Sequence, residues 1–181
     1  MRYVVLDTVI YTLDSIKQEN LAELMTDFTE TPMKAFRYLI DLESVYPNFY
    51  KWYHEVVLED VRHNRNNRKL LIAYSHVDYN GKIKSKITGI AIIKSNEWEK
   101  KICTFRVFSC YRRQGVGSKL LKKCFKELNT KTPLISISHI QVDAFKSIIK
   151  RYGWKRTQVL PEYYQAGVIE YVYNGYLKTF T

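Results

Sequence analysis

The stretch that decides the fold reads Arg112-Arg113-Gln114-Gly115-Val116-Gly117-Ser118. Before it, residues 101–108 are typical of a β-strand, and after it residues 116–128 carry apolar side chains at the three- and four-residue spacing of a helix. Two glycines therefore lie at a strand-to-helix turn. The first amides of a helix lack internal partners, the helix dipole favours an anion, and glycine permits close approach. This turn is thus predicted to bind phosphate, and Arg112 and Arg113 add positive charge beside it.

The spacing of the glycines excludes two common phosphate-binding loops. The nucleoside-triphosphate pattern Gly-x-x-x-x-Gly-Lys-Ser/Thr is absent, and a dinucleotide-binding turn would need a third glycine where Leu120 stands. The segment instead resembles the pyrophosphate loop of the GNAT N-acetyltransferase superfamily, Arg/Gln-x-x-Gly-x-Gly/Ala, which is matched by Arg112, Gly115 and Gly117. Tyr111 supplies the aromatic residue that often precedes the arginine. A glycine-containing loop that merely begins a helix is the competing interpretation.

Composition and charge bound the class of protein. The chain has 181 residues, 46% of them hydrophobic, which suits a single domain over 1–181. No apolar run is long enough to cross a membrane, no signal peptide is visible, and the three cysteines lack metal-binding spacing. We therefore expect a cytoplasmic protein without a metal site and without a membrane partner.

The chain also carries a large positive charge. The 29 Lys and Arg residues exceed the 18 Asp and Glu residues, and the formal net charge is +11. Such a field attracts polyanions, and the phosphates of coenzyme A would account for part of the excess. Because the lysines are scattered along the whole chain, a solvated surface is favoured over a nucleic-acid-binding footprint, and both interpretations stay open.

The hydrophobic pattern predicts an ordered succession of elements. Before the phosphate turn it predicts one strand or a pair of short strands over 3–13, helices over 16–28, 32–42 and 47–61, and strands over 70–77, 83–93 and 101–108. Asn80-Gly81 marks a hairpin, because both turn positions need positive φ. After the helix that follows the turn, it predicts a strand over 134–138, a helix over 142–152 and strands over 154–160 and 168–173.

This order of elements resembles the GNAT fold over essentially the whole chain. The resemblance implies an α/β (α+β) fold with a mixed, mostly antiparallel sheet of about six to seven strands flanked by helices. In this family the strand before the loop and the strand after the helix, here 101–108 and 134–138, splay apart. The pantetheine arm of acetyl-CoA, the co-substrate that the resemblance implies, lies in that gap.

The resemblance also assigns the residues that would hold acetyl-CoA. The backbone of Phe105, Arg106 and Val107 would bind the pantetheine and the thioester carbonyl, stabilising the oxyanion as charge develops. The pyrophosphate would lie on the amides of 114–118, beside the two arginines. The residues concerned are Arg112, Arg113, Gln114, Gly115, Val116, Gly117 and Ser118.

The catalytic positions depart from the family pattern. Many members carry an Asn and a Tyr that acts as the acid on the helix before a glycine–aromatic pair, which here is Gly153-Trp154. The corresponding positions are Val142 and Ile149, both apolar, so the usual proton donor is missing. Tyr152 lies on a different face of that helix.

Several residues are candidates for the missing roles. His139, at the end of strand 134–138, is the preferred general acid or base because a histidine titrates near neutrality. Tyr163 and Tyr164 lie between the last two strands, where this family places substrate contacts. Glu97 and Glu99, before the central strand, would act through water.

Three functions follow from this reading. The first is transfer of an acetyl group from acetyl-CoA to a primary amine of a small molecule, peptide or protein by direct attack. The second is a toxin-type acetyltransferase that acts on aminoacyl-tRNA, which the net charge of +11 supports. The third is a non-catalytic acetyl-CoA-binding sensor or adaptor, which the missing Tyr supports. No motif identifies the acceptor, and a homodimer is left open.

Overall fold

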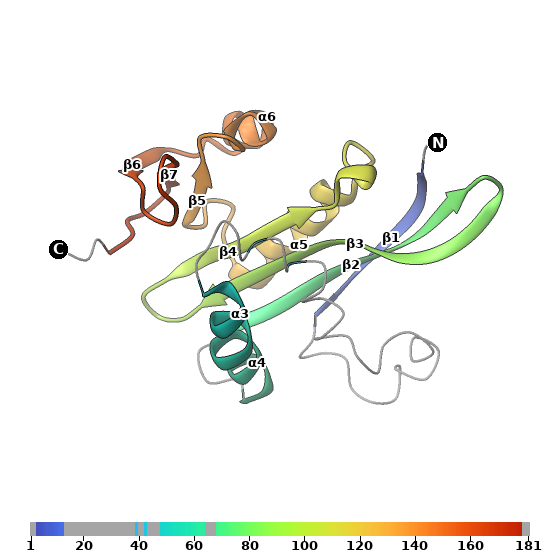
Figure 1. Cartoon of the computed structure of the whole chain (residues 1–181), viewed down its shortest axis with the longest axis horizontal. Coiled ribbons are helices and arrows are strands. Elements are labelled where there is room, and N and C mark those ends of the chain that lie inside the picture. Colours follow the sequence, from blue (N-terminus) through green and yellow to red (C-terminus); the bar gives the residue numbers. More distant parts are fainter. Residues whose placement is uncertain (1–2, 13–38, 40–41, 43–47, 64–67, 179–181) are drawn as a thin grey trace.

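The computed structural model describes residues 3–12, 39, 42, 48–63 and 68–178 (Figure 1). Of the expected helices, 16–28 lies outside the described residues, and so does 32–42 apart from Leu39 and Leu42. The remaining elements follow the order that the sequence predicts.

Four antiparallel strands form the larger sheet, in the order β1-β2-β3-β4. They are β1 (Val4–Thr12), β2 (Arg68–Tyr79), β3 (Lys82–Ser95) and β4 (Lys100–Val107). The β2–β3 hairpin closes at Asn80 and Gly81, whose φ angles of 53° and 76° are the positive values that the turn requires. The predicted hairpin is therefore confirmed.

Three strands form a second antiparallel sheet, in the order β5-β7-β6. They are β5 (Ile135–Ser138), β6 (Arg156–Pro161) and β7 (Ile169–Tyr173). Among the residues that the structure describes, one isolated parallel bridge, between Lys101 and Leu134, joins the two sheets. The expected mixed, mostly antiparallel architecture is confirmed, but its strands are divided between two sheets instead of lying in one.

Helices cover the two faces of the larger sheet (Figure 1). One face carries α5 (Val116–Leu128), and the other carries a helical segment made of α3 (Phe49–Trp52), the π-helical turn η2 (Tyr53–Val57) and α4 (Leu58–His63). The alternation of β3 divides its side chains between them, because Ala91 and Ile93 pack with α5 whereas Ile90 and Ile92 pack with α3 and η2. All four side chains are buried, which explains why β3 reads as a continuous apolar run.

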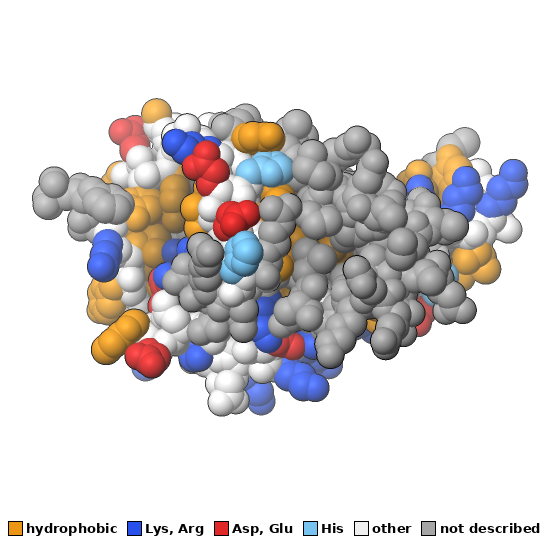
Figure 2. Space-filling view, turned by 90° about the horizontal axis from the view of Figure 1, so that it is seen from below, with side chains coloured by type: hydrophobic (Ala, Val, Ile, Leu, Met, Phe, Trp, Pro, Cys, Tyr) orange, Lys and Arg blue, Asp and Glu red, His pale blue; other side chains and the backbone are white. Residues whose placement is uncertain are grey.

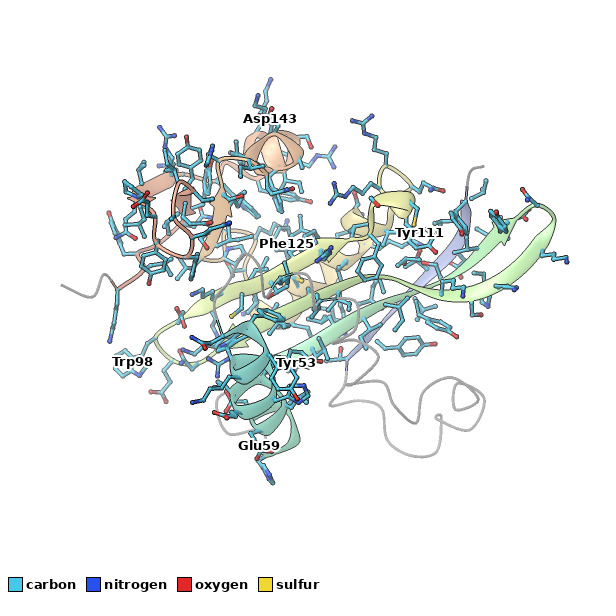
Figure 3. All side chains as sticks on the ribbon, in the orientation of Figure 1. Tyr53, Glu59, Trp98, Tyr111, Phe125 and Asp143 are labelled. Carbon is cyan, nitrogen blue, oxygen red and sulfur yellow. The ribbon has the colours of Figure 1, made fainter. Side chains whose placement is uncertain are left out.

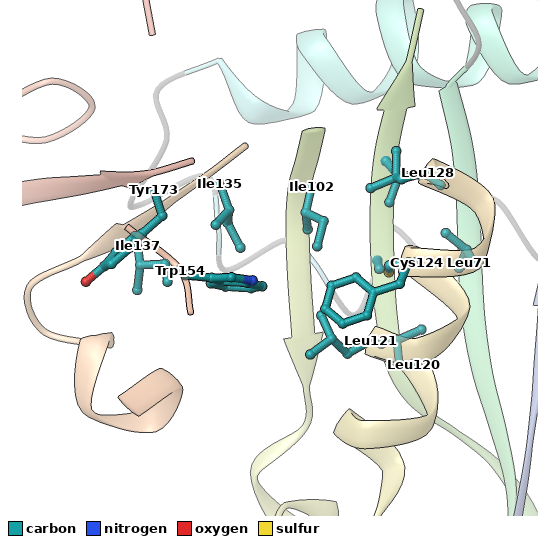
Figure 4. Packing of buried hydrophobic residues seen from close by; sticks show 13 residues of the cluster. Leu71, Ile102, Leu120, Leu121, Cys124, Leu128, Ile135, Ile137, Trp154 and Tyr173 are labelled. Atoms are coloured by element: carbon teal, nitrogen blue, oxygen red, sulfur yellow. The ribbon is translucent and has the colours of Figure 1, made fainter. Parts of the chain in front are cut away.

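The α5 side of the core also ties the second sheet to the first. Figure 4 shows Ile135, Ile137, Trp154 and Tyr173 on one side of Ile102, and the α5 residues on the other. The α5 residues in this cluster are Leu120, Leu121, Cys124, Phe125 and Leu128. The helix α6 (Val142–Tyr152) covers the outside of this junction, where the Tyr152 ring meets Phe125 edge-on at 4.9 Å.

Candidate active site

β4 and β5 begin together and then separate. Near the start of β4, the Ile102 N–H donates to the Leu134 carbonyl (3.0 Å) and the Leu134 N–H donates to the Lys100 carbonyl (2.8 Å). Beyond this point β5 pairs with β7, and among the described residues no strand pairs with the far edge of β4. Figure 1 shows the second sheet and α6 standing off from the upper half of β4. The splay expected between these strands is present.

The backbone groups at this open edge follow from the ladder with β3. The Phe108 N–H donates to the Thr88 carbonyl (3.1 Å), and Arg106 lies opposite Ile90. Because alternate residues of an antiparallel strand face opposite edges, the N–H groups of Phe105 and Val107 face away from β3. The N–H of Arg106 instead faces β3, so its backbone does not lie at the open edge.

The phosphate turn has the geometry that an anion requires. The segment leaves β4 through a 3-10 turn, η3 (Ser109–Tyr111), and Gly115 caps α5 with a φ of 84°. The first intrahelical bond runs from Lys119 N–H to the Gly115 carbonyl (3.1 Å), so the N–H groups of 116–118 precede the hydrogen-bonded part of the helix. No acidic side chain lies in this first turn. The turn can therefore accept an anion without competition from a carboxylate.

The first turn of α5 lies close to the end of β4 at Gly117. A Cβ built there would lie 3.4 Å from a methyl group of Val107, so the first turn of α5 sits directly against the end of the strand. A phosphate on the turn and a chain along the open edge of β4 would consequently be contiguous.

The side chain of Gln114 fastens this turn to β1. Its Nε2 donates to the carbonyls of Tyr3 (3.0 Å) and Cys110 (3.1 Å). Its Oε1 accepts from the Val5 N–H (2.8 Å). The Gln114 side chain is therefore a structural tie, and only its backbone is available to a ligand.

The two arginines of the turn differ in their attachment. The Arg112 Nε donates to the Val107 carbonyl (3.1 Å), which holds the guanidinium beside the open edge of β4. Arg113 lies in the left-handed region with a φ of 61°. Both side chains are exposed, as charged groups that meet phosphates from solvent would be.

A cavity of about 1480 Å³ opens on the α3 side of the gap between β4 and β5. It is lined by Phe49 and Trp52 of α3, Thr104 of β4, Ser136 of β5, and two residues of the loop between β6 and β7, Tyr163 and Tyr164. The predicted substrate contacts Tyr163 and Tyr164 are both in that lining, with their rings edge-to-face at 4.6 Å. Figure 2 shows hydrophobic side chains in this hollow to the left of the helices, with Lys and Arg nearby.

The wall of the cavity carries more positive than negative charge. Its cationic residues are Lys51, Arg68, Lys94, Lys100, Lys101 and Lys178, and its carboxylates are Glu55 and Glu99. Lys94 pairs with Glu99 (2.8 Å), whereas Lys101 and Lys178 have no carboxylate partner among the described residues. Trp98, also in the lining, projects from the β3–β4 turn with 90% of its surface exposed (Figure 3). The cavity thus favours a partner with negative charge and an apolar surface.

The other catalytic candidates lie outside the lining of the cavity or form an ion pair within it. His139 is exposed beyond the end of β5, and its Nδ1 accepts the Ile169 N–H at 3.0 Å. This bond leaves Nε2 as the nitrogen able to exchange a proton, and the residue is not in the lining of the cavity. Glu99 lines the cavity but is held by Lys94, and Glu97 is exposed. Burial raises the pKa of the Cys103 thiol, which keeps this lining residue protonated.

The apolar residues at the family's Tyr and Asn positions serve packing. Ile149 and Val142 both pack against the α5 cluster from α6, and the Tyr152 ring packs on Phe125. None of these three is in the lining of the cavity. Within the described part of α6, no side chain replaces the missing acid in the lining.

The sequence-based reading missed one titratable residue, Glu170 of β7. Its side chain is fully buried, and neither carboxylate oxygen has a hydrogen-bond partner among the described residues. Burial raises the pKa of Glu170 from an ordinary value of 4.5 to about 7, and the nearby Ser136 hydroxyl acts in the opposite direction. The signal was present in the alternation of 168–173, where a glutamate shares one strand face with Val168 and Val172.

Comparison with known proteins agrees with this geometry. The family model for the acetyltransferase (GNAT) domain matches residues 43–173. The chain therefore belongs to the GNAT acetyltransferase family. No curated protein matches the chain in a sequence search. Within the described residues, no helix has the length and apolar character that a membrane crossing requires.

Solved structures show the same fold at low sequence identity. The ribosomal-protein-S18-alanine N-acetyltransferase from Escherichia coli is 16% identical, with 92% of each chain covered and a TM-score of 0.53. NAA60 from Arabidopsis thaliana, solved with acetyl-CoA, is 12% identical, with 92% of this chain and 97% of the other covered and a TM-score of 0.55. An acetyltransferase of the GNAT family from Streptococcus pneumoniae is 14% identical, with 92% and 97% covered and a TM-score of 0.52.

Proposed function

We propose that this protein transfers the acetyl group of acetyl-CoA to a primary amine by direct attack. The observation that carries the proposal is the contiguity of two backbone features. The edge of β4 that no described strand pairs with, which carries the N–H groups of Phe105 and Val107, leads directly to the first-turn amides of 116–118. An extended pantetheine arm and a pyrophosphate would match this pair of surfaces, and NAA60, which shares the fold, holds acetyl-CoA.

The chemistry would use little besides the backbone. A thioester carbonyl bound to the N–H groups at the open edge would be polarised, and the same donors would stabilise the tetrahedral oxyanion. The amine would approach from the cavity on the α3 side, past Tyr163 and Tyr164. Its nitrogen must lose a proton before attack, so a proton acceptor on that side is needed.

The experiment that tests this function measures binding and turnover separately. Calorimetry of the full chain with acetyl-CoA should give a saturable, salt-sensitive binding isotherm. Release of free thiol from acetyl-CoA should then accelerate when a pool of primary amines is added. Tight binding of acetyl-CoA without accelerated thiol release would instead support a non-catalytic sensor or adaptor.

The positive cavity wall favours a second candidate acceptor, the amino group of an aminoacyl-tRNA. Lys101 and Lys178 have no carboxylate partner in the described part of the chain, and the exposed Trp98 offers a surface on which a base could stack. This acceptor predicts binding of tRNA that weakens steeply with salt, because phosphate contacts release counterions. If the acceptor is instead a small molecule or a peptide, tRNA should not compete with the amine pool for the cavity.

A further inference from the structure

Glu170 lies on the face of the second sheet that borders the cavity. It pairs with Ser138 of β5 and Leu160 of β6, and directly opposite residues of neighbouring strands share one face. On the same face, Val172 packs with Leu134 and Leu177, both of which line the cavity. The opposite face of β7, with Tyr171 and Tyr173, packs toward α5 and α6 instead.

The link between the carboxyl and the cavity is Ser136. This residue lies two positions before Ser138 on β5, so its side chain projects from the same face, and it lines the cavity. Its hydroxyl is near enough to lower the pKa of the Glu170 carboxyl, although it does not meet either oxygen in hydrogen-bond geometry. A serine hydroxyl can accept a proton and donate its own at the same time, so it can pass a proton between the cavity and a group behind it.

We infer that Glu170 is the terminal proton acceptor for the amine, reached from the cavity through the hydroxyl of Ser136. The inference rests on the proposed acetyl transfer. A buried carboxyl without a partner costs stability, and such groups persist where they serve the chemistry of a site. Its surroundings also suit the task, because burial raises its pKa into the range where it both accepts and releases protons near neutrality.

The groups around the Glu170 carboxyl are uncharged, so burial is the main influence on its pKa. Ser136 and Ser138 face it from β5, Leu160 from β6, and Tyr163 packs nearby with its phenol donating to the Lys178 carbonyl (2.9 Å). Among the described residues, no charged side chain acts on the pKa of Glu170. Its protonation is therefore set by desolvation and by the Ser136 hydroxyl.

The proton and electron balance closes without another reactant. The substrate ammonium gives one proton to the Ser136 oxygen while the Ser136 hydroxyl proton passes to the Glu170 carboxylate. The neutral nitrogen then attacks the thioester carbon, the N–C bond forms and the C–S bond breaks. The nitrogen loses its second proton to the departing thiolate, which leaves an N-acetyl amide and coenzyme A. Glu170 finally releases its proton to solvent.

The test compares two kinds of nucleophile in the full chain saturated with acetyl-CoA. Primary amines (ethylamine, ethanolamine, spermidine and an alanine-initiated tripeptide, pooled) are protonated at neutral pH and need a base, whereas hydroxylamine is already unprotonated. Glu170→Gln should slow thiol release with the amine pool by about 10²–10⁴-fold and remove the acidic limb of the pH–rate profile. The hydroxylamine reaction should change far less.

Two further variants make the result specific. Ser136→Ala should also slow the amine reaction, and its residual acidic limb should move to higher pH, because loss of the hydroxyl removes the group that lowers the pKa of Glu170. Glu162→Gln is the matched control, since this exposed carboxylate accepts the Gly167 N–H (2.9 Å) through an oxygen that glutamine retains. It should match the unmodified protein.

The outcomes separate this inference from the proposed function. Failure of the unmodified protein to bind acetyl-CoA would overturn the proposed function itself. If it binds acetyl-CoA but does not accelerate the amine reaction, acetyl transfer itself is wrong, and the role of Glu170 falls with it. If the unmodified protein transfers acetyl groups and Glu170→Gln does so with an unchanged profile, only the role of Glu170 is wrong. Loss of the acidic limb in His139→Ala but not in Glu170→Gln would assign the proton to His139 instead. Acetyl-CoA binding by Glu170→Gln shows that the variant is folded.

Discussion

The two sides of the gap between β4 and β5 present different kinds of chemical group. On the side of β4 and α5, the groups that face the gap are backbone amides, positioned by a strand edge and a helix start. On the side of β5 and β7, the relevant groups are side chains, chiefly Ser136 and the buried Glu170. The first side suits a ligand of fixed shape, and the second supplies groups that can exchange protons.

The largest effect should come from blocking the backbone side. Gly117→Glu would place a carboxylate where the proposed pyrophosphate lies, and its Cβ would be in ordinary contact with Val107, so the fold should tolerate it. Calorimetry should show no acetyl-CoA binding by this variant. Lys122→Glu, a larger change of charge on the exposed face of the same helix, should bind like the unmodified protein. Equal affinities for Gly117→Glu and the unmodified protein would remove 116–118 from the site.

The side-chain half predicts an unusual dependence of stability on pH. The folded-state pKa of Glu170, about 7, lies above the ordinary value of 4.5, so the folded protein holds this proton more tightly than the unfolded chain. The contribution of this proton to the free energy of unfolding is fully present below the unfolded-state pKa of 4.5. About 3 kcal/mol of stability is then lost as pH rises through about 7. Urea unfolding of Glu170→Gln should lack this loss, so the variant should be more stable than the unmodified protein at about pH 8. Glu162→Gln should retain it, and a pH-independent difference between the proteins would contradict the buried, titrating carboxyl.

A smaller effect should come from the exposed arginines of the turn. Arg112→Ala and Arg113→Ala should each weaken acetyl-CoA binding by about 1–3 kcal/mol at low salt, and the loss should shrink as salt screens the phosphates. Arg151→Ala, in the exposed last turn of α6, is the matched control and should have no effect. If the Arg112 and Arg113 variants both match this control, the two arginines contribute only surface charge.

The smallest functional effect is expected at the position where many relatives carry their acid. Ile149 packs against the α5 cluster, so Ile149→Ala should lower the free energy of unfolding by about 1–2 kcal/mol, less than a fully buried isoleucine would. It should leave the pH–rate profile of acetyl transfer unchanged, because the side chain carries no proton. A shifted profile would mean that α6 reaches the reacting groups after all.

The difference between the two sides also explains what the sequence could predict. Backbone sites need special φ angles and small residues, so Gly115 and Gly117 identified the turn, and the element order identified the splayed strands. Side-chain sites form from segments that are distant in the chain. Nothing near Glu170 in the sequence shows that Ser136 lies beside it, because the β5–β7 pairing creates that contact.

Some details escaped the sequence for local reasons. The strands divide into two sheets because β4 and β5 pair only at an isolated bridge among the described residues. Hydrophobic patterns do not encode where such pairing stops. The catalytic role of His139 stays a prediction, and the sequence did not show that its Nδ1 accepts the Ile169 N–H, which leaves Nε2 for proton exchange. Gln114 belonged to the predicted loop, but its side chain proved to be a tie to β1.

Residue-resolved amide exchange with and without acetyl-CoA tests the central claim most directly. The N–H groups of Phe105 and Val107 face the open edge, and that of Arg106 faces β3. If acetyl-CoA lies between β4 and β5, its binding should slow exchange at Phe105, at Val107 and across 116–118, while Arg106, already bonded within the sheet, should change little. Unchanged exchange at Phe105 and Val107 in the saturated protein would contradict the account.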